Sequence, residues 1–315
     1  MSQGLASAEF RSGVQTTTDS AIPPAISKTF ENRTSTRAPY STTAEAKGVD
    51  VSVVMTTYRR PQTLPVAINS ALEQEGVRVE VIVVDDCPRG SAEPVLSGIA
   101  DPRVRYVRNP NPSNGHPAIA RNVGWPLAAG EIIHFADDDD LVPPGLYRDA
   151  VAEFGRHQDV GVLFGRIEVF GDPSEELEND RSLFLRSARR AARLQRLNSA
   201  RAVTSHLLFL DLLFVGGSSL VRRSVVAELG GLPSRTELME DLDFLAHATR
   251  RFGARYMDRV SLYYRVWPSR MHSQNDLQSA LDRSYTRIHQ EYRRTFGAFD
   301  FYTLKFAART LLRFL

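Results

Sequence analysis

The fold of this chain is decided at residues 131–141, which read Glu-Ile-Ile-His-Phe-Ala-Asp-Asp-Asp-Asp-Leu. The apolar run from Ile132 to Ala136 is typical of a buried strand in a mostly parallel sheet. Carboxylates crowded at its end oppose one another's ionisation, and a cation such as Mg²⁺, which prefers carboxylate oxygens and retains substrate phosphates, relieves that repulsion. Alternation along an extended backbone puts Asp137 and Asp139 on one side and Asp138 on the other. We therefore expect an Asp-x-Asp metal site rather than a solvated acidic loop.

Composition limits the classes of protein to consider. The 315 residues are 42% hydrophobic and 24% charged, as in a globular protein, and the formal charge of +2 gives no indication of a nucleic-acid partner. The single cysteine, Cys87, excludes an internal disulfide framework and a multi-cysteine zinc site. We find neither a secretory signal nor an apolar run of the ~20 residues that span a bilayer. The expected location is the cytoplasm, either free or peripheral on the inner face of the plasma membrane.

Strand and helix patterns alternate from Val51 onward, after a Ser-, Thr-, Ala- and Pro-rich tail at residues 1–48 that we expect to be disordered. Strands are predicted at 51–55, 79–84, 104–107 and 132–136, with helices opening at Pro61 and Ala92 and passing through Ala120. This alternation predicts an α/β fold with a mostly parallel sheet covered by helices on both faces. In such sheets ligands bind outside the carboxyl ends of the strands. The polar residues predicted at that edge are Thr56, Tyr58, Asp85, Asp86, Asp137 and Asp139.

The loop after the first strand indicates the kind of ligand. It lacks the Gly-x-Gly-x-x-Gly of a dinucleotide-binding fold, which disfavours a Rossmann dehydrogenase. An aromatic ring and a carboxylate at neighbouring strand ends suit a nucleobase, with Tyr58 stacking on it and Asp85 or Asp86 accepting its N–H. An ordinary charged turn at Asp85-Asp86 is the alternative.

The second half is less regular, with a helix after Pro144, a long strand at 160–170, a helical stretch at 176–201 and a strand at 255–265. Glu240 and Asp241 open a helix, where acids stabilise the macrodipole, or where one of them acts as a general base. His272 is either an ordinary surface or core histidine or a contact to metal or diphosphate.

Two basic segments have open interpretations. The arginine-rich stretch 181–201 is either a solvated helix face or a site for acceptor phosphates or anionic lipid headgroups. Residues 301–315 form a basic amphipathic helix, in which Lys305, Arg309 and Arg313 recur every fourth residue among apolar side chains. Such a helix either docks on a membrane surface or packs against a neighbouring element.

These motifs, in their order and spacing, resemble family 2 glycosyltransferases of the GT-A fold. The resemblance is carried by residues 51–72, 81–86, 120–140 and 240–243, and it covers roughly residues 49–265. It implies a nucleotide-binding half at about 49–142, an acceptor half at about 143–265 and a helical extension at 266–315 that is a candidate for facing a membrane. It also implies that a divalent cation, Mn²⁺ or Mg²⁺, assists transfer from a nucleotide-diphosphate sugar with inversion of the anomeric carbon.

The resemblance also assigns roles to individual residues. It implies Asp241 as the catalytic base, Asp137 and Asp139 as metal ligands, and Thr56, Tyr58 and Asp86 (or Asp85) at the nucleobase. We expect His272 as a further candidate ligand, and Arg59, Arg121, Asn122, Asp138 and Glu240 as further substrate contacts. Two departures from the family pattern stand out. Cys87-Pro88-Arg89 replaces the usual Gly-Ser, and the run of four aspartates leaves open a ligand role for Asp138.

We therefore expect a metal-dependent inverting transferase that moves a sugar, from a UDP-sugar first of all, to an acceptor hydroxyl in polysaccharide, cell-surface glycan or glycoconjugate synthesis. The expected partners are the nucleotide-sugar donor, a glycan, lipid-linked or small-molecule acceptor and an anionic membrane surface, with no nucleic acid. One alternative is a sugar nucleotidyltransferase, although residues 56–61 lack the glycine of a triphosphate-binding loop. The other is a non-catalytic, membrane-docked scaffold that binds nucleotide sugars.

Overall fold

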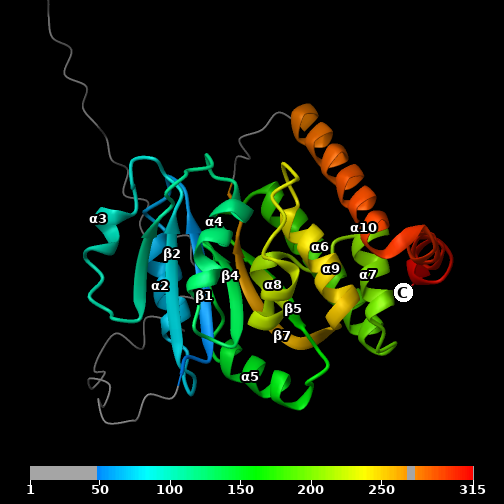
Figure 1. Ribbon diagram of the computed structural model, residues 1–315, viewed down its shortest axis with the longest axis horizontal. Coiled ribbons are helices and arrows are strands. Elements are labelled where there is room, and N and C mark those ends of the chain that lie inside the picture. The colour runs from blue at the N-terminus through cyan, green and yellow to red at the C-terminus, as the bar shows by residue number, and fades with distance from the viewer. Residues whose placement is uncertain (1–47, 268–273, 315) are drawn as a thin grey trace, which may run out of the picture.

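A single sheet in the order β3-β2-β1-β4-β6-β5-β7 forms the centre of the computed structural model, which describes residues 48–267 and 274–314 (Figure 1). Nearly all of the expected tail lies outside these residues. The strands of the described part are β1 (Val51–Thr57), β2 (Val79–Asp85), β3 (Val104–Arg108), β4 (Ile132–Asp137), β5 (Val162–Phe170), β6 (Ser219–Arg222) and β7 (Ala254–Arg265). The strands predicted at 51–55 and 255–265 are therefore confirmed, as β1 and β7.

The sheet is parallel except at β6. β1 pairs in parallel with β2 and β4, and β2 with β3, whereas β6 runs antiparallel to both β4 and β5. β7 is parallel to β5. The predicted mostly parallel α/β sheet is confirmed. Because β6 is reversed, the segment that precedes it lies at the edge where the other strands end.

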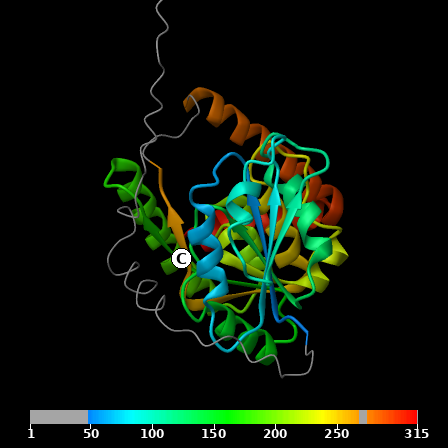
Figure 2. The ribbon, with the colours of Figure 1, turned by 90° about the vertical axis from the view of Figure 1, so that its left-hand side faces the viewer.

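Helices cover both faces of the sheet (Figure 2). Val51, Val53 and Met55 of β1 pack in one apolar cluster with α2 and α5, whereas Val54 packs in the other cluster. This alternation follows from the strand geometry, in which successive side chains point to opposite faces. The helices are α2 (Leu64–Leu72), α3 (Glu93–Leu96), α4 (Pro117–Gly124), α5 (Leu146–Arg156), α6 (Glu175–Gln195), α7 (Ala200–Phe209), α8 (Arg223–Leu229), α9 (Glu240–Phe252) and α10 (Gln274–Thr310).

Some helix ends differ from the predicted ones for local reasons. α2 begins at Leu64 rather than Pro61, with Pro65 in its first turn, where a missing backbone N–H costs nothing. The stretch 176–201 is divided between α6 and α7, and Ser199 caps α7 by accepting a hydrogen bond from the N–H of Ala202. Gly297 interrupts α10 with a φ of 86°, a conformation that glycine adopts at little cost.

Candidate functional site

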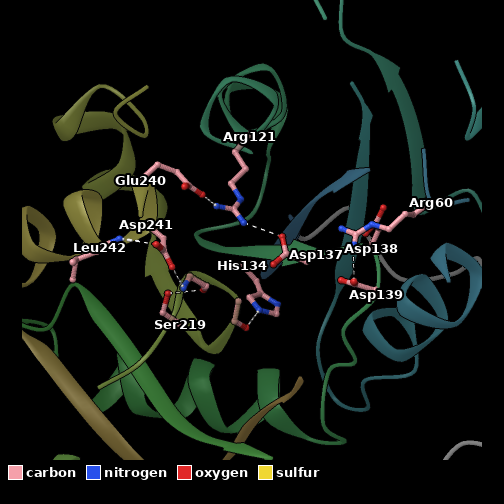
Figure 3. Close-up of polar contacts among 12 residues, drawn as sticks. Arg60, Arg121, His134, Asp137, Asp138, Asp139, Ser219, Glu240, Asp241 and Leu242 are labelled. Carbon is pink, nitrogen blue, oxygen red and sulfur yellow. Dashed lines mark hydrogen bonds and ion pairs between the residues drawn. The ribbon is translucent and has the colours of Figure 1, made fainter. Parts of the chain in front are cut away.

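The acidic run lies at the carboxyl edge of the sheet, where Figure 3 shows Asp137, Asp138 and Asp139. The Asp137 side chain at the end of β4 is 37% exposed, whereas Asp138, Asp139 and Asp140 are buried. Burial raises the pKa of Asp138 to about 7 and also raises the pKa values of Asp139 and Asp140, against the opposing effect of Arg60 on Asp138 and Asp139. The run therefore holds carboxyl groups whose ionisation needs a nearby positive charge.

Arg60 supplies part of that charge. Its guanidinium donates a hydrogen bond to Asp139 Oδ2, and Nη2 lies 3.0 Å from Asp138 Oδ1. The preceding residue, Arg59, has a φ of 60°, a conformation that is uncommon for residues other than glycine. The loop after β1 is thus shaped so that Arg60 reaches back over the end of β4.

The end of β7 contacts the acidic run from the opposite side. Trp267 Nε1 donates to Asp139 Oδ2 at 2.8 Å, and the backbone N–H of Arg265 donates to Asp140 Oδ1 at 2.8 Å. The Arg265 guanidinium lies over the rings of Phe170 and Trp267, with centroid distances of 4.5 and 5.5 Å. We did not predict Arg60, Arg265 or Trp267 as site residues from the sequence.

Arg121, on α4, joins the acidic run to α9. Nη2 donates to Asp137 Oδ1 at 2.9 Å and Nη1 to Glu240 Oε1 at 2.8 Å (Figure 3). The Arg121 side chain is only 4% exposed, so its charge is balanced by these two carboxylates and not by water. Burial raises the pKa of Glu240, with the Arg121 charge opposing that shift. Arg121 and Glu240, both predicted substrate contacts, are therefore paired with each other.

Asp241 has a different environment from its neighbour Glu240. Its Oδ2 accepts the backbone N–H of Gly216 at 2.9 Å and its Oδ1 accepts the N–H of Leu242 at 2.8 Å. Asp241 is partly exposed, whereas Glu240 is buried. His134 on β4 holds the Gly216–Gly217 segment in place, since its Nε2 lies 2.8 Å from the carbonyl oxygen of Gly217. The geometry thus leaves Asp241, not Glu240, accessible to a second substrate.

At the carboxyl end of β2, Asp85 fixes the loop that follows β2, and Asp86 fixes the loop that follows β3. Asp85 accepts the N–H groups of Cys87 and Ala92 at 2.9 and 2.8 Å. Asp86 accepts side-chain and backbone hydrogen bonds from the loop 109–115, including the N–H of Gly115 at 2.6 Å. Both aspartates are buried. The predicted nucleobase contact of either one is therefore in competition with these internal partners.

Tyr58 lies between the loop after β1 and the loop held by Asp86. A Cβ added at Gly115, whose φ is 89°, would lie 2.9 Å from Cδ1 of the Tyr58 ring, so only glycine fits there. The Arg59 guanidinium lies 4.8 Å from the ring centroid. Tyr58 and Arg59 thus contact each other in the loop after β1, and Thr56 lies near the end of β1; their predicted contacts with substrate stay predictions.

Asn122, another predicted substrate contact, has its side-chain amide bound within the protein. The side-chain amide of Asn122 donates to the carbonyl of Leu232 at 2.7 Å and accepts the Leu232 N–H at 2.8 Å, so Asn122 ties α4 to the loop before α9. A Cβ at Gly231 would lie 2.4 Å from Asn122 Oδ1, so this contact requires glycine. His272 lies outside the described residues.

The donor set suits a divalent cation that is shared with a substrate. No cluster of three or more His, Cys, Asp or Glu side chains able to hold a metal occurs within residues 48–267 and 274–314. Asp137 and Asp139 nevertheless match the way Mg²⁺ is commonly bound, by one or two carboxylates completed by waters and substrate phosphates. The carboxylates also outnumber the guanidiniums, since Asp137–Asp140, Glu240 and Asp241 face Arg60, Arg121 and Arg265. The residues therefore fit a cation that arrives with a diphosphate.

Comparison of the sequence with family models identifies the family to which this fold and site belong. The model described as "Glycosyl transferase family 2" matches residues 52–230, more than half of the chain. This protein belongs to glycosyltransferase family 2. The matched range includes β1, β2, β4 and the acidic run but ends before Glu240-Asp241.

Curated relatives match parts of the chain. The succinoglycan biosynthesis protein ExoO of Rhizobium meliloti (strain 1021) is 36% identical over 161 residues, which are 51% of this chain and 43% of ExoO. The putative colanic acid biosynthesis glycosyl transferase WcaA of Escherichia coli (strain K12) is 36% identical over 96 residues, 30% of this chain and 34% of WcaA. The matches thus span less than half the length of either relative.

Solved structures confirm the GT-A fold. Staphylococcus aureus TarS 1-349 in complex with UDP-GlcNAc superposes with a TM-score of 0.56 at 18% identity, covering 78% of this chain and 66% of that one. The mannosyltransferase PcManGT from Pyrobaculum calidifontis, in complex with GDP-Man and Mn²⁺, gives 0.54 at 17% identity, covering 79% and 65%. At such identities the likeness concerns the fold alone.

Proposed function

We propose that this enzyme transfers a sugar from a nucleotide-diphosphate sugar, with a UDP-sugar as the first candidate, to an acceptor hydroxyl, with a divalent cation and with inversion at the anomeric carbon. The observation that carries the proposal is the position of Arg121. It contacts Asp137 at the end of β4 and Glu240 at the start of α9. The end of β4 is thereby tied to the start of α9, where the candidate base Asp241 directly follows Glu240.

The compared proteins support the choice of substrates. TarS was crystallised with UDP-GlcNAc and PcManGT with GDP-Man and Mn²⁺. ExoO and WcaA carry names of succinoglycan and colanic acid biosynthesis, which supports a role in the synthesis of a cell-surface polysaccharide. The acceptor is then a growing glycan, either free or carried on a lipid.

Each residue of the site has a distinct part in this proposal. Asp137 and Asp139 hold the cation, which when bound stabilises negative charge on the leaving diphosphate. Tyr58 stacks on the nucleobase, with Thr56 and Arg59 beside it. Asp241 accepts the proton of the acceptor hydroxyl, and its two backbone hydrogen bonds hold the carboxylate in place for that transfer.

The Arg60 guanidinium has a related role. It neutralises Asp139 and Asp138 in the protein alone, and it lies where an incoming diphosphate needs a counter-charge. Asp138 is buried beneath it and contributes to donor binding by holding Arg60. His272 follows the Trp267 strand end in the sequence and remains a candidate ligand to the metal or the diphosphate.

A donor screen tests the proposal. Thermal unfolding is measured with a panel of UDP- and GDP-sugars, each with and without Mn²⁺, and the donor that raises Tm only with the metal is used in transfer assays. NMR of the product then reports the anomeric configuration. Failure of every donor to bind in the presence of Mn²⁺ would overturn the proposed function.

A matched pair of variants tests the base. Asp241→Asn should still bind the donor but lose about a thousandfold in transfer rate, because proton transfer by a positioned side chain contributes ~10²–10⁴-fold. Asp258→Asn makes the same chemical change at an exposed position on β7 and should keep the wild-type rate. Near wild-type transfer by Asp241→Asn would assign the base elsewhere.

A further inference from the structure

The C-terminal part of α10 presents aromatic side chains to solvent. Phe299, Tyr302 and Phe306 are 84%, 55% and 67% exposed. Their spacing of three and four residues places them on one face of the helix, which we call the aromatic stripe. Single exposed apolar residues are common on proteins, but a contiguous row of large ones marks an interaction surface.

The opposite face of the same helix is already buried in the protein. Phe301, Leu304 and Ala308 are buried, and the Phe301 ring contacts Phe209 of α7 and His289 of α10, with centroid distances of 5.1 and 5.5 Å. The apolar residues that the sequence showed mixed together are thus divided between two faces. Packing within the chain accounts for the buried face. The stripe stays largely exposed, although the Tyr302 ring also contacts the Phe301 ring, with a centroid distance of 5.4 Å.

The charge around the aromatic stripe is positive. Lys305 and Arg309 lie beside it, and residues 301–314 contain no acid. Asp300 is the acid nearest to the stripe in sequence. It is buried, accepts hydrogen bonds from Arg201 and Arg250, and accepts one from the hydroxyl of Tyr292 at 2.9 Å. A partner with negative charge over an apolar layer is therefore complementary to this face.

Among residues 48–267 and 274–314, no helix is both long and apolar enough to cross a bilayer. A helix with an outward aromatic face and flanking cations suits the plane of the membrane interface instead, where aromatic rings lie at the headgroup level and lysine and arginine contact anionic lipids. We propose that the aromatic stripe, with Lys305 and Arg309, docks this protein on an anionic phospholipid membrane. This proposal is independent of the sugar-transfer chemistry.

Vesicle binding of the full-length protein tests the proposal. Cosedimentation with phosphatidylcholine vesicles containing phosphatidylserine should recover the protein, and pure phosphatidylcholine vesicles should recover far less. Lys305→Glu/Arg309→Glu should weaken binding to anionic vesicles by roughly 100-fold or more, since two attractive charges become repulsive. Phe299→Ser/Phe306→Ser should abolish binding at either composition.

A control variant and a second measurement distinguish membrane docking from self-association. Leu185→Ser alters an exposed apolar residue on α6 and should bind vesicles like the wild type. All variants should keep their Tm because none of the altered side chains is buried. Phe299→Trp should show a blue-shifted emission with anionic vesicles, quenched by lipids labelled in the acyl chain. If instead sedimentation in buffer shows a dimer that Phe299→Ser/Phe306→Ser dissociates, and vesicles bind none of the proteins, the stripe is a contact between two copies and the proposal is wrong.

Discussion

Arg121 Nη1 lies 2.8 Å from Glu240 Oε1, although 119 positions separate the two residues in the chain. The pair is buried, so the desolvated charges depend on each other and on Asp137, the other partner of Arg121. Breaking a buried pair by removing one partner costs several kcal/mol, because the remaining charge is left uncompensated. The start of α9, where Asp241 lies, is consequently fixed by a residue of α4.

Arg121→Met should therefore damage both stability and catalysis. We expect a loss of about 3–5 kcal/mol in the free energy of unfolding and at least a hundredfold loss in transfer rate, measured by denaturant unfolding and a donor-to-acceptor assay. Arg251→Met removes an exposed arginine that pairs with Glu228 and should cost no more than ~1 kcal/mol. A transfer rate for Arg121→Met within threefold of the wild type would show that this bridge does not support the base.

Adjacent glycines provide a sharper test of the position of Asp241. A Cβ at Gly216 would lie 3.2 Å from Cβ of Asp241, whereas a Cβ at Gly217 would meet its nearest atom, in Leu262, at an ordinary 3.5 Å. Gly216→Ala should displace the Asp241 carboxylate and lower kcat by about tenfold with the donor KM unchanged. Gly217→Ala should leave both parameters within twofold of the wild type. Equal effects of the two substitutions would contradict the proposed role of this turn.

In the proposed function Arg60 and the cation compete for Asp139, which predicts an unusual response to metal. Arg60→Gln should bind Mn²⁺ without donor about tenfold more tightly than the wild type, an extra ~1.4 kcal/mol that adds roughly 2–3 °C to the Mn²⁺-induced rise in Tm. Arg105→Gln, at an exposed position of β3, should respond like the wild type. If Mn²⁺ stabilises Arg60→Gln no more than it stabilises the control, Arg60 does not occupy the cation position.

His206 should make the stability depend on pH. Burial lowers its pKa from 6.5 to about 4, with the nearby Arg190 charge acting in the same direction. Below pH 6.5 the unfolded chain binds a proton at His206 that the folded protein does not bind. The neutral, buried His206 therefore contributes to the free energy of unfolding above pH 6.5, and this contribution is lost as the pH falls toward 4. Over this pH range His206 should lower the free energy of unfolding by roughly 3 kcal/mol.

His206→Asn keeps a donor for the carbonyl of Asp211, 3.1 Å from Nδ1 in the wild type, and removes the titration. Its unfolding free energy should fall less between pH 7 and pH 4.5 than that of the wild type. His157→Asn, at a partly exposed histidine, should retain the wild-type pH dependence. If the unfolding free energy of His206→Asn depends on pH as that of the wild type does, His206 is not the group responsible.

The sheet was predictable where local pattern and tertiary role agree. β1, β2 and β4 are runs of apolar residues because they are buried on both faces, and each run is followed at once by polar residues. β6 has only four residues, too few to show a period, and its reversed direction depends on its neighbours in the sheet. The sequence could not reveal it.

The candidate site was predictable only in part. The sequence indicated which strand ends meet, and the structure joins Asp137 and Glu240 through Arg121 and pairs Asp139 with Arg60. The partners of each side chain depend on distant segments. The amide of Asn122 is occupied by Leu232, and Asp139 is contacted by Arg60 and Trp267. The aromatic residues before Trp267 made this segment stand out in the sequence, but no local pattern predicts that Trp267 contacts Asp139.

The reversed strand β6 decides which part of the chain reaches Asp241. It brings the segment before it, not the one after it, to the edge where the parallel strands end, so Gly216 reaches Asp241 from a segment that lies outside β1 to β4. A change in the residues just before β6 would therefore alter the surroundings of Asp241 directly, without a change in the pairing of β1 with β2 and β4.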